Sequence, residues 1–297
     1  QNPALDFPLF APPREPIALA DYAAGLHAAT LVPDGGTLQI GIGSLGDAVT
    51  QALVLRHQKN VDFKGLIASL GAGDGEAAPF NTGLYACTEL LVEGLLDLFQ
   101  AGILKREVDG AVVHAGFFVG SRAFYKTLRD MPPEVAAKFR MTSIPFVNEL
   151  YHGEDEKRRA RVKARFINDA MMATLLGSVV SDGLDDGRVI SGVGGQYNFV
   201  AQAFALEGAR SVIMLRASRN AGGKAQSNIR WNYGHTTIPR HLRDIVVTEY
   251  GVADLRGKSD REVIAAMLNV TDSRWQVELL RHAKDAGKIE RSYEIPK

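Results

Sequence analysis

The sequence predicts an α/β domain with an open, largely parallel sheet and flanking helices. Two observations predict it. Short apolar runs of strand length recur along the chain, and stretches with apolar residues at helical spacing separate them. Such alternation favours parallel strands joined by crossover helices. The 297 residues, 46% of them hydrophobic and 23% charged, suit one large domain or two modest ones.

The expected elements can be given in chain order. Residues 1–16 contain five prolines and predict an extended linker arm, and the start at Gln1 indicates a piece of a longer polypeptide. Residues 154–159 carry only charged side chains and predict the solvated start of a helix. The expected strands are residues 37–43, 65–71, 110–114, 144–147, 189–190, 211–215 and 244–248. The expected helices are residues 17–31, 44–55, 90–104, 160–173, 200–205, 261–267 and 273–286.

Charge and cysteine content exclude several classes of function. Lys+Arg and Asp+Glu each number 34, so the chain lacks the basic excess of nucleic-acid-binding proteins. The single cysteine, Cys87, cannot form an internal disulfide, and no spacing resembles a metal site. No apolar run is long enough to span a bilayer, and no signal peptide opens the chain. We therefore expect a cytoplasmic protein without membrane or nucleic-acid partners.

The most informative motif is the glycine-rich segment 189–199. An apolar run leads into Gly192, Gly194 and Gly195, and a helical pattern follows Phe199. Glycines let the backbone approach a ligand, and a helix N-terminus adds partial positive charge for an anion or an oxyanion. A tight turn that binds nothing is the alternative interpretation.

A second glycine motif, Gly41 to Gly46, matches the dinucleotide fingerprint between an expected strand and an expected helix. However, no strand that ends in Asp or Glu follows at the usual interval. Asp62 is the nearest acidic residue, and it lies in a polar segment. A turn that lines some other ligand fits these residues better than a dinucleotide site does.

The segment 85–94 brings two candidate nucleophiles together, Cys87 and Glu89. No histidine lies near Cys87 in the sequence, and a lone cysteine is usually buried and inert. Glu89 follows a glycine-rich loop, and we expect it to begin a helix with Thr88 as its N-cap. Glu89, Glu93 and Asp97 also lie four residues apart, which suits an exposed acidic stripe.

A third cluster, residues 216–227, combines arginines, hydroxyl groups and Lys224 around a Gly-Gly pair. Basic and hydroxyl side chains in a glycine loop after a strand suit phosphate contacts. An ordinary surface loop explains the same residues equally well.

Together these segments resemble the acetyl-CoA hydrolase/transferase family, which includes the 4-hydroxybutyrate CoA-transferases. The resemblance rests on residues 37–43, 88–90, 192–199 and 246–259, and it covers nearly the whole chain from Pro16 onward. It implies the CoA-transferase-like fold of the NagB/RpiA/CoA-transferase type. It also implies that residues 17–297 are the C-terminal catalytic portion, with the N-terminal domain absent from this sequence.

The resemblance also implies roles for residues. Glu89 would be the catalytic glutamate, which attacks an acyl-CoA thioester and then carries CoA as a glutamyl thioester before a carboxylate acceptor completes the exchange. CoA would be a substrate, with no permanently bound cofactor, and a homo-oligomer is a further expectation. The expected oxyanion and CoA-binding residues are Gly194, Gly195, Gln196, Asn198, Phe199, Gly41, Gly43 and Lys224.

The chain departs from the family pattern at two places. Asn198 stands where the family usually has Asp, and Leu90 with Val92-Glu93 replaces the usual residues after the glutamate. The acyl substrate can therefore differ from those of the best-known members. Two other functions stay open at this point: an acyl-CoA hydrolase that uses the same residues with water, and a nucleotide-binding module in which Glu89 is inert.

Overall fold

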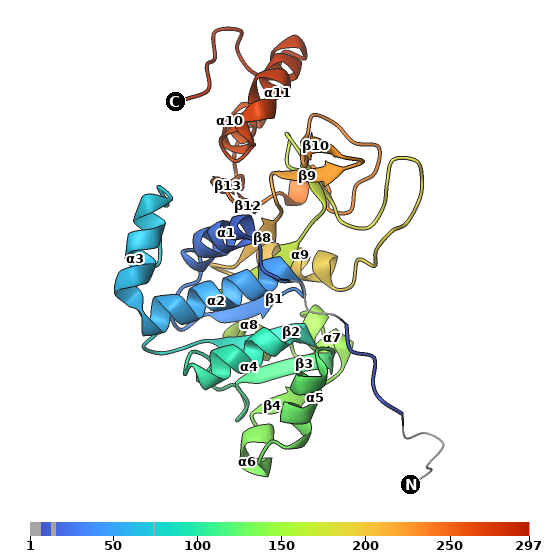
Figure 1. Ribbon diagram of the computed structural model, residues 1–297. Coiled ribbons are helices and arrows are strands. Elements are labelled where there is room, and N and C mark those ends of the chain that lie inside the picture. The colour runs from blue at the N-terminus through green and yellow to red at the C-terminus, as the bar shows by residue number, and fades with distance from the viewer. Residues whose placement is uncertain (1–6, 13–15, 74, 297) are drawn as a thin grey trace.

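A computed structural model describes residues 7–12, 16–73 and 75–296 of the chain (Figure 1). Its centre is an eight-stranded sheet in the order β13-β12-β8-β5-β1-β2-β3-β4, in which only β12 and β13 pair antiparallel. This confirms the α/β class with a largely parallel sheet. The strands of this sheet are β1 (Thr37–Ile40), β2 (Tyr85–Leu91), β3 (Val113–Phe118), β4 (Phe139–Met141), β5 (Arg165–Asp169), β8 (Arg210–Met214), β12 (Ile245–Thr248) and β13 (Gly251–Asp254).

Helices cover both faces of the sheet. Leu38 and Ile40 of β1 pack in the core on the side of α1 and α2, whereas Phe166 of β5 packs against Phe199 of α9 on the opposite side. The helices are α1 (Leu19–Ala29), α2 (Ser44–Gln58), α3 (Asn60–Ser69), α4 (Glu93–Gln100), α5 (Arg122–Arg129), α6 (Pro133–Ala136), α7 (Ile144–Asn148), α8 (Glu154–Ala160), α9 (Gln196–Ala205), α10 (Asp260–Asn269) and α11 (Ser273–Asp285), with the 3₁₀ turn η2 (Arg240–Leu242).

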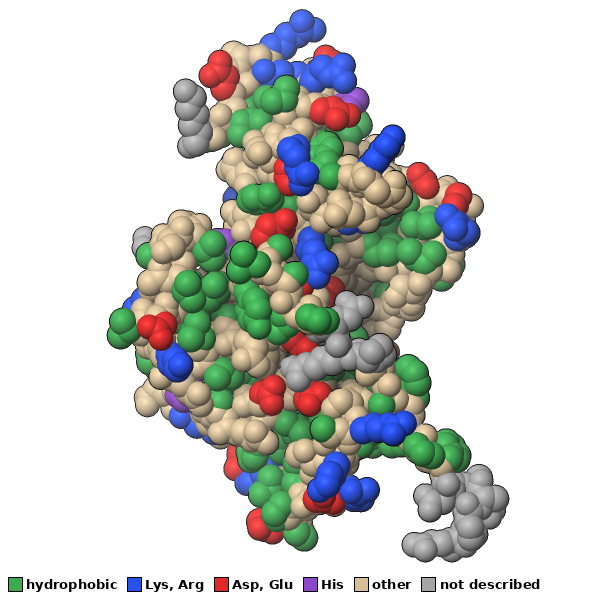
Figure 2. All heavy atoms as spheres, viewed as in Figure 1, with side chains coloured by type: hydrophobic (Ala, Val, Ile, Leu, Met, Phe, Trp, Pro, Cys, Tyr) green, Lys and Arg blue, Asp and Glu red, His purple; other side chains and the backbone are tan. Residues whose placement is uncertain are grey.

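Smaller elements lie at the ends of the molecule. The short strands β6 (Met172–Thr174), β7 (Val179–Val180) and β11 (Ile229–Arg230) form a three-stranded sheet, and β9 (Ser218–Ala221) with β10 (Lys224–Ser227) forms a hairpin. In Figure 1, α10 and α11 stand beyond β13 at one end, and α5 and α6 lie at the other. In Figure 2, hydrophobic side chains gather over α1, α2 and α3, where an apolar groove of about 830 Å³ lies.

The order of the strands reverses between β1 and β5. From β1 the chain adds β2, β3 and β4 on one side, and it then returns to place β5, β8 and β12 on the other. In sheets of this kind, ligands bind beyond the carboxyl ends of the strands at such a switch point. The fold therefore indicates the ends of β1, β2 and β5 as the place to look for a site.

Several expected elements are wrong in type. Residues 65–71 were expected as a strand but belong to α3 and the turn after it, because Phe63 and Ile67 are buried four residues apart while Leu66 is exposed. Residues 144–147 were also expected as a strand, yet they form α7, in which Pro145 occupies the first turn, where proline is tolerated. Short apolar runs of this length do not distinguish strand from helix.

The expected helices at residues 90–104 and 160–173 are also wrong in part. The first begins only at Glu93, because Leu90 and Leu91 still pair with β3. The second expectation is replaced by β5 and β6, since β5 lies between β1 and β8 and is buried on both faces. Only Phe166 and Ile167 of β5 are apolar, so its sequence shows neither an alternating pattern nor a long apolar run. Residues 189–190 form a loop rather than a strand, with Val189 75% exposed.

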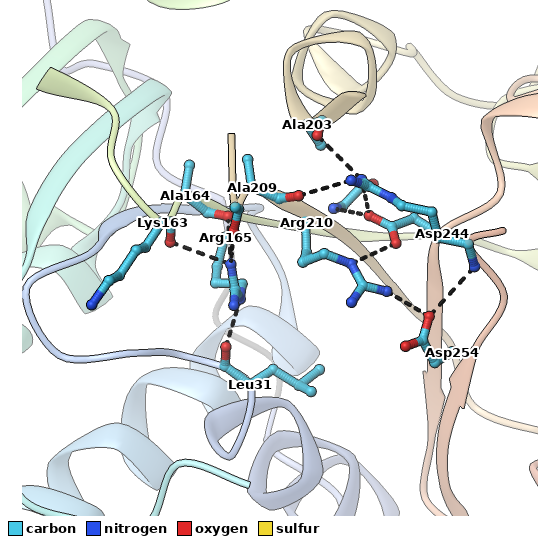
Figure 3. A network of polar contacts seen from close by, with 12 residues as sticks. Leu31, Lys163, Ala164, Arg165, Ala203, Ala209, Arg210, Asp244 and Asp254 are labelled. Carbon is cyan, nitrogen blue, oxygen red and sulfur yellow. Dashed lines mark hydrogen bonds and ion pairs between the residues drawn. The ribbon is translucent and has the colours of Figure 1, made fainter. Parts of the chain in front are cut away.

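A buried ionic network ties the edge hairpin to the rest of the sheet at the amino ends of the strands (Figure 3). The Asp244 side chain is 1% exposed, and its Oδ1 accepts a hydrogen bond from Arg210 at 2.7 Å. Its Oδ2 accepts from Arg256 and from the Ser211 amide, the latter at 2.7 Å. Arg210 also binds Asp254 at 2.5 Å. A buried carboxylate with several donors holds its neighbours in one arrangement. This network lies at the amino edge, away from the carboxyl ends where the cavity described below is found.

The expected arm at residues 1–16 falls partly outside the described residues. Within the described part, Phe7, Pro8 and Leu9 line a cavity of about 960 Å³ beside α5. The Tyr125 hydroxyl donates a hydrogen bond to the main-chain oxygen of Phe10 at 2.6 Å. Residues 7–10 therefore lie against α5.

Candidate active site

Glu89 lies near the carboxyl end of β2, not at the start of a helix as the sequence predicted. Thr88 is 1% exposed, and its hydroxyl donates to the main-chain oxygen of Leu90 rather than capping a helix. The N-cap of α4 is Val92. A strand within a sheet holds its side chains more rigidly than a loop does, so Glu89 has a fixed support.

A cavity of about 450 Å³ opens at the carboxyl ends of three neighbouring strands. Gly41 follows β1, Glu89 is on β2, and Asp169 ends β5. The loop from Ser191 to Gly195, which leads into α9, also lines the cavity. The cavity lies at the point where the strand order reverses, as expected for a ligand site in an open α/β sheet.

The glycine loop packs directly against the carboxylate of Glu89. A Cβ at Gly195 would lie 2.0 Å from Glu89 Oε2, and a Cβ at Gly194 would lie 3.7 Å from the same oxygen. Gly194 has a φ of 56°, in the left-handed region that favours glycine. Residue 195 must therefore lack a side chain, because any Cβ would occupy the space of the carboxylate.

Asn148 binds the same carboxylate oxygen, next to the glycine loop. Its Nδ2 donates a hydrogen bond to Glu89 Oε2 at 3.2 Å, and its side chain is 6% exposed at the end of α7. The Gln202 side chain donates to the main-chain oxygen of Asn148 at 2.8 Å, which ties α7 to α9. Sequence reasoning missed Asn148, because it lies 59 residues from Glu89 and no local motif links the two.

Two of the predicted binding residues at the start of α9 line this cavity, and one does not. Gln196 donates from Nε2 to the main-chain oxygen of Asp169 at 2.9 Å, which joins the glycine loop to β5. Phe199 lines the cavity but is 1% exposed and packs on Phe166 with ring centroids 5.3 Å apart, so it also supports the core. Asn198 is half-buried on α9 and is not among the residues that line the cavity.

The Gly41–Gly46 turn divides this cavity from a second one of about 310 Å³ at the N-terminus of α2. Gly41 lines both cavities, whereas Gly43 lines only the second and has a φ of 126°. The strand–turn–helix placement expected of the motif is confirmed. Asp62 lies in the first turn of α3 rather than at a strand end, so the acidic partner of a dinucleotide fingerprint is not at that position.

Lys224 lies apart from Glu89. It is exposed at the start of β10, just after the Gly222-Gly223 turn of the β9–β10 hairpin. It does not line the cavity that contains Glu89. A role for Lys224 in binding CoA therefore concerns a part of the ligand outside this cavity.

Cys87 is on the same face of β2 as Glu89, two residues earlier, but its thiol is enclosed. The side chain is 1% exposed and packs with Tyr85 and Val147. Burial raises the pKa of the Cys87 thiol, so the reactive thiolate is scarce at neutral pH. The structure favours the inert interpretation of this cysteine.

Asp169 is a cavity residue that sequence reasoning missed. It falls inside a segment that was expected to be helical, so its position at a strand end was hidden. Burial and the nearby carboxylates of Asp21 and Asp47 together raise the pKa of Asp169 to about 7, against the lowering effect of Arg216. A second acidic residue therefore lines the cavity of Glu89, and its carboxyl group is mostly protonated below pH 7.

The described residues show neither a metal-binding cluster nor a membrane-spanning helix. Within residues 7–12, 16–73 and 75–296, no group of three or more His, Cys, Asp or Glu side chains could hold a metal ion. Over the same described residues, no helix has the length and apolar character needed to cross a membrane.

A match to a known protein family identifies the family of this chain. Residues 120–283, more than half of the chain, match the acetyl-CoA hydrolase/transferase C-terminal domain. The chain belongs to the acetyl-CoA hydrolase/transferase family. The matched region includes Asn148 and the Gly194-Gly195 loop, and Glu89 precedes it.

Individual relatives agree with this assignment. The chain is 27% identical to the 4-hydroxybutyrate coenzyme A transferase of Clostridium kluyveri over 91% of its own length and 56% of that protein. It is 25% identical to the succinyl-CoA:cyclohexane-1-carboxylate CoA transferase of Geobacter metallireducens, over 96% of the chain and 58% of that protein. It thus spans little more than half the length of these curated relatives.

The fold is similar to those of solved structures, which include a 4-hydroxybutyrate CoA-transferase from Porphyromonas gingivalis with a TM-score of 0.69 and 21% sequence identity, over 95% of this chain and 59% of that one. The crystal structure of RipA from Yersinia pestis matches with a TM-score of 0.75 and 26% sequence identity, over 95% of this chain and 57% of that one. The CoA-transferase-like fold predicted from the sequence is confirmed.

Proposed function

We propose that this chain forms the glutamate-bearing part of a CoA-transferase, which moves CoA between an acyl-CoA and a small carboxylic acid. One observation carries the proposal. The Glu89 carboxylate lines a cavity at the strand switch point, where Asn148 and the glycine loop fix its position. The two relatives described above, which match 91% and 96% of the chain, are CoA-transferases, which supports the same reaction class.

The reaction proceeds by exchange of acyl bonds at the Glu89 carboxylate. A Glu89 oxygen attacks the thioester carbonyl of the acyl-CoA, the C–S bond breaks, and an acyl-glutamyl anhydride and CoA thiolate result. The thiolate attacks the Glu89 carbonyl and releases the first acid as its carboxylate. The acceptor carboxylate then repeats these two steps in reverse order, which yields the new acyl-CoA and restores Glu89. No proton is gained or lost over the cycle.

The glycine loop supplies the stabilisation that the tetrahedral intermediates need. Gly194 and Gly195 lie against the carboxylate, so their main-chain N–H groups are our candidates for binding the developing oxyanion. A preorganised N–H donor of this kind is worth on the order of 3 kcal/mol in the transition state.

Hydrolysis of the acyl-glutamyl anhydride competes with transfer, and the family name covers hydrolases as well as transferases. Transfer requires that water be excluded while the acceptor enters. Acceptor dependence separates the two activities, because a transferase consumes acyl-CoA only when a carboxylate acceptor is present.

Replacement of Glu89 by glutamine tests the proposal in the full-length protein. Glu89→Gln keeps the shape of the side chain and removes the nucleophile, so we expect acyl-CoA consumption to fall by more than about a thousandfold. Glu93→Gln, four residues later on α4, is the matched control and keeps wild-type activity. Undiminished turnover in Glu89→Gln would contradict the proposal.

A further inference from the structure

Gly41 is the first residue after β1, and the sheet places it between Glu89 and Asn168. The β1–β2 register, continued three residues along both strands, sets Gly41 beside Glu89. The β1–β5 register, continued by one residue, sets it beside Asn168. The Gly41 amide donates a hydrogen bond to the main-chain oxygen of Ile167 at 2.9 Å, so the pairing with β5 extends this far. Glu89 and Asn168, which line one cavity, therefore lie on either side of a position that carries no side chain.

Position 41 faces the side of the sheet on which Glu89 lies. Gln39 and Asn168 are buried and exchange two side-chain hydrogen bonds, each of 3.1 Å. Phe166, two residues before Asn168 on β5, packs on Phe199 of α9, so this amide pair is on the α9 side. The glycine loop that leads into α9 contacts the Glu89 carboxylate, which is on the same side. Alternate residues of a strand share a face, so position 41 faces this side together with position 39.

The described residues leave room for a side chain at Gly41. A Cβ there would meet its nearest described atoms at 3.7 Å, an ordinary van der Waals contact. By contrast, a Cβ at Gly46 would lie 2.3 Å from the main-chain oxygen of Gly41. Gly41 is also not one of the glycines with a positive φ. Neither packing nor backbone conformation among the described residues requires this glycine, so the space that it leaves beside Glu89 is free for a ligand.

We propose that the acyl group carried by Glu89, and the acid that replaces it, lie over Gly41, so that residue 41 limits the size of the acid. This inference rests on the CoA-transferase function proposed above. The amide pair of Gln39 and Asn168 is the floor of this acyl pocket. Strands β2 and β5 are two strand spacings apart, about 10 Å, and the pocket lies between them. A pocket of this width suits short-chain carboxylic acids.

The experiment compares acetyl-CoA with butyryl-CoA as donors, with propionate as the acceptor, in the full-length protein and its Gly41→Ala variant. A single methylene in an enclosed pocket changes kcat/KM by about tenfold to two-hundredfold. We expect the ratio of kcat/KM for butyryl-CoA to that for acetyl-CoA to fall by about tenfold or more in Gly41→Ala. This ratio does not depend on how much of the variant is folded.

Gly65→Ala is the matched control. Gly65 is exposed on α3, where a Cβ would meet nothing within 4 Å, and this variant should keep the wild-type ratio.

The acceptor acids give a second readout. The acyl group and the acceptor occupy the same place in successive steps. With propionyl-CoA as the donor, Gly41→Ala should therefore also lower kcat/KM for butyrate relative to acetate by a similar factor. An effect that acts only through the CoA part of the donor would leave this acceptor ratio unchanged.

The outcomes separate the acyl pocket from the transferase function. An unchanged donor or acceptor ratio in Gly41→Ala, including an equal loss of activity with both chain lengths, would overturn the acyl pocket and leave the transferase function intact. If wild type forms no propionyl-CoA from acetyl-CoA and propionate, the transferase function itself fails, and the acyl pocket fails with it.

Discussion

Substitution of Gly195 by alanine should displace the Glu89 carboxylate. The new Cβ would lie 2.0 Å from Glu89 Oε2 and 2.8 Å from Asn148 Nδ2. Carbon and oxygen atoms that are not bonded lie about 3.3 Å apart at contact, so the carboxylate must move by more than about 1 Å. A displacement of that size at a reacting group can cost on the order of a hundredfold in rate. We expect kcat/KM for acyl-CoA to fall by about that factor.

The backbone at residue 195 does not itself oppose alanine. Its φ is −82°, which any residue adopts, so the loss arises from the contact with Glu89 rather than from backbone strain. Gly192→Ala in the same loop is the matched control, because a Cβ there meets nothing within 4 Å. The assay is the initial rate of CoA release from acyl-CoA in the full-length protein, with thermal unfolding to confirm the fold. Activity of Gly195→Ala within twofold of wild type would refute the positioning of Glu89 described here.

Three further predictions concern groups away from the glycine loop. Cys87→Ala should keep CoA-transfer activity within about twofold in the rate assay, because the buried thiol is not the nucleophile; a large loss would restore Cys87 as a candidate. Asp244→Asn should lower the free energy of unfolding by about 3–5 kcal/mol in urea titrations, whereas Asp254→Asn, whose side chain is 48% exposed, should cost less than about 1 kcal/mol. Equal costs would contradict the burial argument. The pKa of Asp169 is raised to about 7, so between pH 4 and pH 7 the folded chain keeps this proton while the unfolded chain loses it. The free energy of unfolding of the wild type should therefore fall over this pH range, relative to that of Asp169→Asn, by on the order of 1 to 4 kcal/mol. A pH-independent difference would contradict the shift.

The sequence predicted the parts of the site that depend on local chemistry. The glycines at 194 and 195 predicted a close backbone approach to an anion, and the structure places them against a carboxylate. A helix follows them as expected, but it begins at Gln196 rather than at residue 200. Glu89, which the sequence analysis named as the catalytic candidate, lines a cavity, and its support is a strand and not the start of a helix.

The rest of the site depends on contacts between distant segments. Asn148 belongs to a short apolar run that could not be distinguished from a strand, and its partner lies 59 residues away. Asp169 ends the strand β5, in which only Phe166 and Ile167 are apolar, so the sequence shows no strand pattern there. Asn148 and Asp169 come near this cavity only because the fold places β2 and β5 on either side of β1, and no local sequence pattern specifies that placement.

The most direct test of the account is to trap CoA on the protein. The full-length protein would be incubated with acyl-CoA and then with borohydride, which reduces a glutamyl thioester to an alcohol, and its peptides would be analysed by mass spectrometry. The account predicts reduction at Glu89 alone, with Glu93 in the same peptide region unchanged and no reduction when acyl-CoA is omitted. An unmodified Glu89 in protein that still consumes acyl-CoA would contradict the covalent route.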